Sequence, residues 1–351
     1  MVLIAFLIFS VCFVGTVVAI NYVLNKHRSP AHVAHVNIDA TVQTLLHKHQ
    51  TEYDSLGIFY WINGDLKQAE EMFLKALDID IALDRRENLA DRYVNLGTLY
   101  RLRGDLAHAE TMFIRSTELN KVLGRKQNLA NVYAMLGNLY FERGNLQSAE
   151  EMYLSSTALH QEVENHQDLA DNYMQLGILY KKRQEIRAAE NMFLESLRIN
   201  QVLDHQEGIA DNYNHLGNLY TLSKDTLHAE EMYLKSLEIN QRLNRTGEVT
   251  VVFCSLGLLY EQRGDSQSTK TMYLSSLVNN TLDCKENLAN NYANVASLYT
   301  TYGNLPQAEK MYVRSLELYR DIKHPNAKQV QLILEKIKSS KGKQSQGNPK
   351  K

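Results

Sequence analysis

Two apolar stripes of helical spacing recur along this chain every forty residues. In one copy, the stripe consists of Leu89, Tyr93, Leu96 and Tyr100, which are spaced by four, three and four and so lie on one face of a predicted helix. A second stripe of the same kind covers residues 106–116. Between the two, Gly104 can end the first helix in a left-handed conformation, and Asp105 can cap the next helix through its carboxylate. Each unit is therefore predicted to be a hairpin of two helices.

Seven such units follow one another between residues 41 and 323. The same place in the first helix is held by Gly57, Gly97, Gly137, Gly177, Gly217, Gly257 and, in the seventh unit, Ala296. Each glycine is expected to let its helix approach the alanine of the second helix closely. The N-caps of the first helices are predicted to be polar residues such as Asn88, Asn128, Asp168 and Asn287. A repeat of this length indicates one stacked array rather than separate domains.

The residues of the repeat resemble the tetratricopeptide repeat family. Its first helix carries an aromatic residue, then Leu-Gly, then a tyrosine, as in residues 173–180, and its second helix carries an aromatic residue between small ones, as at Phe193. The resemblance covers residues 41–323, about four fifths of the chain. It implies an all-α fold, a right-handed α-solenoid of about seven helical hairpins.

Two features depart from the commoner form of that family. The period here is forty residues, and no proline ends the second helices, because the four prolines are Pro30, Pro306, Pro325 and Pro349. Both features indicate lengthened second helices. They resemble the long-repeat branch of the family, which includes kinesin light chains and the Leu-Gly-Asn-rich polarity adaptors.

The N-terminal residues 1–24 are predicted to be a transmembrane anchor. Residues 2–24 carry no charge and are long enough to cross a bilayer as a helix. A cleaved signal peptide is the alternative, although its usual basic n-region is missing. Lys26 and Arg28 follow the span, which predicts a single-pass membrane protein whose soluble body faces the cytoplasm.

The segments that flank the array are short. Residues 25–40 are predicted to be a tether between the membrane and the repeats. Residues 324–338 carry an apolar edge and are predicted to form a helix that caps the open end of the solenoid. Residues 339–351 are polar and basic, and they are predicted to be disordered.

Composition and motifs argue against several classes of function. With 38 basic and 40 acidic side chains, the chain lacks the basic field that nucleic acid requires. The three cysteines are too few and too scattered for a disulfide framework or a zinc site. The histidines that cluster around residues 25–40 lack the i, i+4 spacing that places two imidazoles side by side on a helix: His27, His32, His35, His47 and His49. No catalytic motif is present, so we expect neither an enzyme nor a cofactor. An enzyme would require a unique buried polar cluster.

The faces of the first helices that the core does not use are expected to line a concave groove. The predicted partner-binding residues on these faces are Asp91, Asn95, Asn138, Asp171, Gln175, Asp211, Asn214, His215, Asn218 and Asn294. Carboxamides can both donate to and accept from the backbone of an extended peptide. In the long-repeat adaptors that this chain resembles, an asparagine ahead of the Leu-Gly pair does this. Here Asn95 and Asn294 hold that place, with Gln175 and His215 as substitutes.

The predicted partner is a protein segment, extended or helical. Chaperone-binding tetratricopeptide domains hold a C-terminal carboxylate, which Asp91, Asp171 and Asp211 would repel here. A neutral or basic segment is therefore expected. These features predict a membrane-anchored protein–protein interaction adaptor, and the alternative is a structural assembly factor that packs against a membrane complex without a peptide-binding groove. Nothing in the sequence predicts the oligomeric state.

Overall fold

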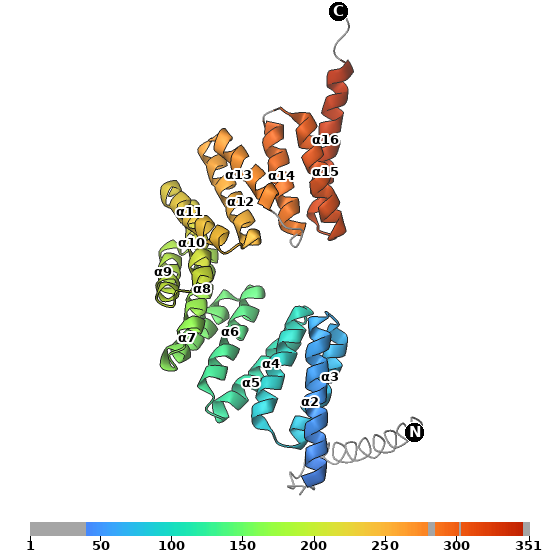
Figure 1. The fold of residues 1–351 in the computed structure, drawn as a ribbon, viewed down its shortest axis with the longest axis vertical. Helices are drawn as coiled ribbons and strands as arrows, with labels where there is room; N and C mark the ends of the chain where they lie inside the picture. Colours follow the sequence, from blue (N-terminus) through green and yellow to red (C-terminus); the bar gives the residue numbers. More distant parts are fainter. Residues whose placement is uncertain (1–39, 280–284, 302, 347–351) are drawn as a thin grey trace, which may run out of the picture. The chain divides into compact units, whose positions relative to one another are not determined.

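A computed structural model describes residues 40–279, 285–301 and 303–346 of the chain (Figure 1). Every regular element in these ranges is an α-helix, and the helices form seven consecutive hairpins followed by one further helix. The hairpins are α2 (Ala40–Ile62) with α3 (Leu66–Ala82), α4 (Arg86–Leu102) with α5 (Leu106–Val122), α6 (Lys126–Glu142) with α7 (Leu146–Glu162), α8 (His166–Lys182) with α9 (Ile186–Val202), α10 (Gln206–Leu222) with α11 (Thr226–Arg242), α12 (Thr246–Arg263) with α13 (Ser266–Asn279), and α14 (Lys285–Thr301) with α15 (Leu305–Asp321). The last helix is α16 (Asn326–Gln346). The predicted all-α array of seven hairpins is confirmed.

The chain divides into two compact units. Unit 1 ends at Asp168, and unit 2 begins at Leu169, just inside α8. Within each unit, a first helix packs against the second helix of its own hairpin, and that second helix packs against the first helix of the next hairpin. Each helix therefore packs mainly against the helices that precede and follow it in the chain, as expected of a repeat array.

The turns inside the first two hairpins follow the prediction. Gly104 has a φ of 78°, the left-handed conformation that a glycine adopts without strain. Asp105 then caps α5, because its carboxylate accepts a hydrogen bond from the backbone N–H of His108 at 3.2 Å. The same arrangement ends α2 and begins α3 through Gly64 and Asp65.

The predicted N-caps of α4 and α6 are wrong by three residues, because the observed N-caps are Arg85 and Arg125. Helix α4 begins at Arg86 and α6 at Lys126, so Asn88 and Asn128 lie inside the first turn instead of before it. The physical reason is the preceding turn. Asp84, which lies two residues after the end of α3, adopts a positive φ of 47°, and α4 starts two residues later at Arg86.

The glycines of the first helices make a different close contact from the predicted one. A Cβ added to Gly177 would lie 2.5 Å from the ring of Phe193 on the second helix of the same hairpin, and one added to Gly217 would lie 2.6 Å from Tyr233. The expected approach to alanine is therefore corrected to an approach to this aromatic ring. The rings are almost completely buried, and burying a side chain of this size stabilises the fold by roughly 1.5–3 kcal/mol.

The last helix closes the end of unit 2. Val330, Leu334 and Ile337 of α16 are buried in one cluster with Tyr312 and Tyr319 of α15. Helix α16 continues to Gln346, whereas the sequence predicted that order ends at residue 338.

The prediction of a transmembrane helix ahead of the array has to be corrected. Among the described residues, no helix combines the length and the apolar character that crossing a bilayer requires. The predicted segment, residues 2–24, lies outside the described ranges, as do residues 25–39 of the predicted tether. The transmembrane part of the fold prediction is therefore wrong by this finding, and so is the single-pass membrane localisation derived from it.

Candidate functional site

A hollow of about 380 Å³ opens on unit 2, where the free faces of three first helices meet. Its lining comes from α8, α10, α11 and α12: Lys181, Asn218, Thr221, Leu222, Tyr233, Ser255, Leu258 and Gln262. We call it the unit 2 hollow. It combines aliphatic contact area with amide, hydroxyl and ammonium groups, the mixture that a binding site for a polypeptide requires.

Asn218, one of the predicted groove residues, lies in this hollow and is held by a core tyrosine. The hydroxyl of Tyr233 donates a hydrogen bond to Asn218 Oδ1 at 3.0 Å and lies 3.2 Å from the hydroxyl of Thr221. In unit 1 the hydroxyl of Tyr153 donates to Asn138 Oδ1 in the same way, at 2.6 Å. Burial raises the pKa of Tyr233, so its hydroxyl remains a donor. These two carboxamides are therefore oriented by the core and present their amide N–H groups.

Asn214 and His215 precede Asn218 on α10. The imidazole of His215 stacks on the ring of Phe193, with a centroid separation of 5.2 Å and an interplanar angle of 4°. Asn214 Oδ1 and His215 Nδ1 are buried, and no hydrogen-bond partner for either lies among the described residues. Burial lowers the pKa of His215 to about 4, with a smaller contribution in the same direction from the charge of Lys181 and an opposing one from Asp211. His215 is therefore neutral at physiological pH.

Unit 2 is expected to lose stability as the pH falls from 6.5 towards 4, because His215 binds a proton in the unfolded chain before it does so in the folded one. This part of the stability is complete above pH 6.5. The loss should not exceed about 1.4 kcal/mol per pH unit. Urea unfolding of the wild type and of H215Q across this range tests it. The two unfolding free energies should converge as the pH falls, and parallel curves would contradict the assignment.

The aspartates that were expected to repel a carboxylate are largely neutralised. Asp91 forms an ion pair with Arg125 at 3.1 Å, and Asp211 forms one with Arg245 at 2.9 Å. Each arginine directly precedes the first helix of the next hairpin. Asp171 is exposed on α8.

The remaining predicted residues are not part of the unit 2 hollow. Asn95 on α4, Gln175 on α8 and Asn294 on α14 are partly exposed, and none of them lines it. The structure therefore places Asn214, His215 and Asn218 on one helix. Of these, Asn218 lines the hollow together with Lys181 and Tyr233, which were not among the predicted residues. A signal for Tyr233 is present in the sequence. Asparagine follows the Leu-Gly pair in the hairpins whose second helix carries Tyr153 or Tyr233, and isoleucine or threonine follows it in those with phenylalanine.

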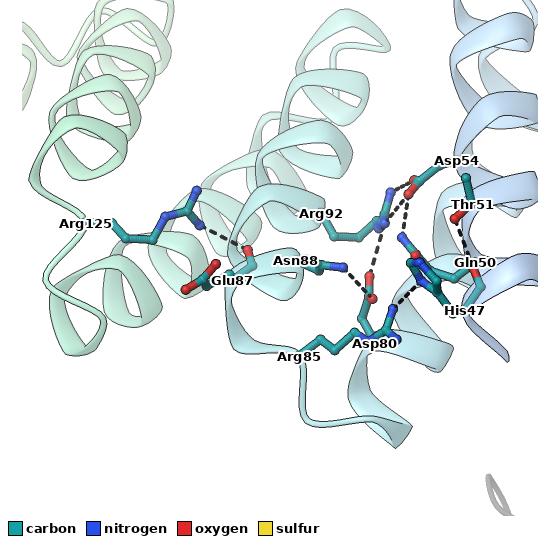
Figure 2. A network of polar contacts seen from close by, with 10 residues as sticks. All are labelled: His47, Gln50, Thr51, Asp54, Asp80, Arg85, Glu87, Asn88, Arg92 and Arg125. Carbon is teal, nitrogen blue, oxygen red and sulfur yellow. Dashed lines mark hydrogen bonds and ion pairs between the residues drawn. The ribbon is translucent and has the colours of Figure 1, made fainter. Parts of the chain in front are cut away.

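Unit 1 contains a unique buried polar cluster, which repeat symmetry did not predict. Figure 2 shows Arg92 of α4 between the carboxylates of Asp54 on α2 and Asp80 on α3. Arg92 and Asp80 are almost fully buried. The guanidinium donates to Asp54 Oδ2 at 2.7 Å and to Asp80 Oδ2 at 3.1 Å.

The other carboxylate oxygens in this cluster are also engaged. Asn88 donates to Asp80 Oδ1 at 3.3 Å, Gln50 donates to Asp54 Oδ2 at 2.6 Å, and Asp54 Oδ1 contacts the Arg92 guanidinium. Burial raises the pKa of Asp80 to about 6, although the hydrogen bond from Asn88 opposes the shift. Since every oxygen already has a partner, the cluster joins the first two hairpins and offers no free general base.

The comparisons with known proteins agree with the repeat. Family models described as tetratricopeptide repeat match residues 49–121, 128–201 and 210–242, which together make up more than half of the chain. The chain belongs to the tetratricopeptide repeat family. None of the curated proteins matches it.

Several solved structures share the tetratricopeptide fold with this chain. BtubC (BKLC) from P. vanneervenii is 23% identical with a TM-score of 0.56, and the match covers 63% of this chain and 94% of that one. The apo form of RapI is 17% identical with a TM-score of 0.59, covering 78% and 98%. Aspartyl phosphate phosphatase F from Bacillus subtilis is 12% identical with a TM-score of 0.60, covering 79% and 71%. At these identities the likeness concerns the fold alone.

Membership of the tetratricopeptide family indicates a protein–protein interaction adaptor. Members of this family are for the most part scaffolds without enzymatic activity, and their stacked helices offer extended surfaces to other proteins. In unit 2, such a surface includes the unit 2 hollow.

Proposed function

We propose that this tetratricopeptide protein is an adaptor that binds a segment of a partner protein across the first helices of unit 2. The unit 2 hollow is the observation that carries the proposal. Leu222 and Leu258 supply apolar contact, and Asn218 and Gln262 supply amide groups that can hydrogen-bond to a peptide backbone. Because Tyr233 fixes the carboxamide of Asn218, part of this surface is already organised before a segment binds.

The charge of the partner follows from the ends of the first helices. Asp171 and Asp211 lie towards the N-terminal ends of α8 and α10, and there we still expect a neutral or basic stretch of the segment. The expectation is weaker than the sequence implied, because Arg245 already pairs with Asp211. A segment with little net charge satisfies this surface best.

Site-specific photo-crosslinking tests the proposal. A photoreactive residue placed at Leu258, which is 45% exposed in the hollow, should crosslink a partner, and the crosslink should map to one short segment of it. Leu234 on α11 is the matched control, because it is 47% exposed and lies outside the lining of the hollow. Crosslinking at Leu258 should also disappear in the N218A/Q262A variant. Equal crosslinking at both positions, or no effect of that variant, would contradict the proposal.

A second candidate is supported by a different surface. Each second helix from α3 to α15 exposes one aliphatic side chain at the same place in the repeat, between 36% and 47% accessible: Leu74, Ile114 and Leu154 in unit 1, and Leu194, Leu234, Leu274 and Val313 in unit 2. Such a regular row favours packing against another protein without a peptide in the groove. This structural assembly role predicts that the photoreactive residue at Leu234, rather than the one at Leu258, gives the crosslink.

A further inference from the structure

Lys181 is a cation in the unit 2 hollow, and no carboxylate in the part of the chain that the structure describes pairs with it. It stands in the last turn of α8, where its side chain lines the hollow beside Asn218 and Leu222. No acidic group of the described residues forms an ion pair with its ammonium group. Burial lowers the pKa of Lys181, and no neighbouring charge opposes the shift. A partly desolvated ammonium group is costly unless a negative charge compensates it.

The repeat shows what such a cation takes as its partner. Lys181 is the sixteenth residue of α8, and Arg101 is the sixteenth residue of α4 in unit 1. Arg101 forms an ion pair at 2.5 Å with Glu142, the last residue of α6, the next first helix. The corresponding last residue of α10 is Leu222, which is 60% exposed. In unit 2, a leucine therefore takes the place of the carboxylate that unit 1 supplies from its own chain.

We propose that Lys181 binds an acidic side chain of the partner segment, whose carboxylate takes the place that Glu142 holds beside Arg101 in unit 1. This inference rests on the proposed binding of a segment in the unit 2 hollow. The exposed side chain of Leu222 and the neighbouring Leu258 receive an aliphatic residue next to the acidic one. The preferred segment thus carries an aspartate or glutamate beside an aliphatic residue, and little other charge.

The rest of the hollow is compatible with this chemistry. Its lining contains no aspartate or glutamate, and Asn218, Gln262 and Ser255 can donate to the second carboxylate oxygen or to the segment's backbone. His215 is neutral, so its imidazole neither competes with Lys181 for the carboxylate nor repels a basic residue elsewhere in the segment.

Peptide selection on the full-length chain tests the inference. A displayed library of random peptides is selected on the wild type and on K181Q, and selected peptides are synthesised with acetylated and amidated ends, so that the only carboxylates are side chains. Wild-type selections should be enriched in aspartate or glutamate beside an aliphatic residue. Exchanging that acidic residue for its amide, or using K181Q, should weaken binding about tenfold by fluorescence anisotropy, as expected for loss of a charge-assisted hydrogen bond.

Two further variants sharpen the result. L222E supplies the carboxylate in cis, as Glu142 does in unit 1. It also removes apolar contact from both peptides, so it should weaken the acidic peptide clearly more than its amide counterpart. R101Q removes the corresponding cation of unit 1 and should have no effect on either peptide. All three substituted side chains are at least partly exposed, and far-ultraviolet circular dichroism confirms that the variants remain folded.

The possible failures are distinguishable. If no peptide binds, or if bound peptides do not crosslink to position 258, the proposed function itself fails. If peptides bind at the hollow but show no acidic preference and no response to K181Q, the proposed binding of a segment in the hollow is supported, whereas the proposed role of Lys181 is overturned. Peptides that bind only with a free C-terminal carboxylate would also overturn the assignment to a side chain.

Discussion

Replacing Arg92 with valine is expected to lower the free energy of unfolding of the first two hairpins by about 3–5 kcal/mol. The substitution leaves Asp80, which is fully buried, without its cation, and it removes the main partner of Asp54. Urea unfolding combined with hydrogen exchange of α2, α3 and α4 measures the loss. Hydrogen exchange is needed because a repeat array can unfold one part at a time.

The repeat supplies the control for this substitution. In the next pair of helices, Asn120 of α5 and Val132 of α6 hold the places of Asp80 and Arg92, and both are buried. The double variant D80N/R92V installs that neutral pair and should recover most of the stability lost in R92V. If R92V alone were as stable as the wild type, the buried ion cluster would contribute nothing to joining the hairpins.

Replacing Gly177 with alanine is expected to destabilise unit 2 by about 1–3 kcal/mol through overpacking. The added methyl group would lie 2.5 Å from the ring of Phe193, which is fully buried and cannot move without disturbing the hairpin. The loss exceeds the roughly 1 kcal/mol that alanine gains over glycine in a helix interior. Thermal and urea unfolding of the full-length variant would show it as a lower midpoint.

Gly247 is the matched control for Gly177. It also lies in a helix, α12, but a Cβ added there would have no atom within 4 Å. G247A should therefore be neutral or slightly stabilising, by up to about 1 kcal/mol. Equal effects of the two substitutions would show that helix propensity, and not the contact with the ring, decides the outcome. The seventh hairpin carries Ala296 at the place of Gly177, and there Ala296 is buried in one cluster with Tyr312.

The helices and their pairing could be predicted from the sequence because the spacing of the apolar stripes and the positions of the turn residues indicate the same boundaries. Two stripes per unit gave the hairpins, and Gly104 with Asp105 marked the turn correctly. The partner of the glycines was missed, although the aromatic ring follows each glycine by sixteen residues in the first six hairpins, as Phe193 follows Gly177. Packing distances decide such a pair, and spacing alone only suggests it.

The electrostatics of the candidate site were predicted less well. Asp91 and Asp211 looked like free charges, yet an arginine lies 34 residues beyond each of them, which is the separation of both observed ion pairs. Lys181 was not among the predicted binding residues. Its importance depends on burial and on the missing counterpart of Glu142, and neither follows from a helical pattern without the packing of neighbouring hairpins.

The choice between tyrosine and phenylalanine in the core also affects which hydrogen bonds the carboxamides of the groove can form. Where Tyr233 occupies the second helix, its hydroxyl takes one of the two acceptor positions on the oxygen of Asn218, so the amide N–H group is the part of this side chain left fully available to a bound peptide. A phenylalanine at the same place has no hydroxyl group, so both acceptor positions of that oxygen would be free and the amide could donate to and accept from a peptide backbone. The buried hydroxyl oxygen of Tyr233 thus influences which hydrogen bonds the groove offers to a partner. A redesign of the groove's specificity would therefore begin with this residue of the core.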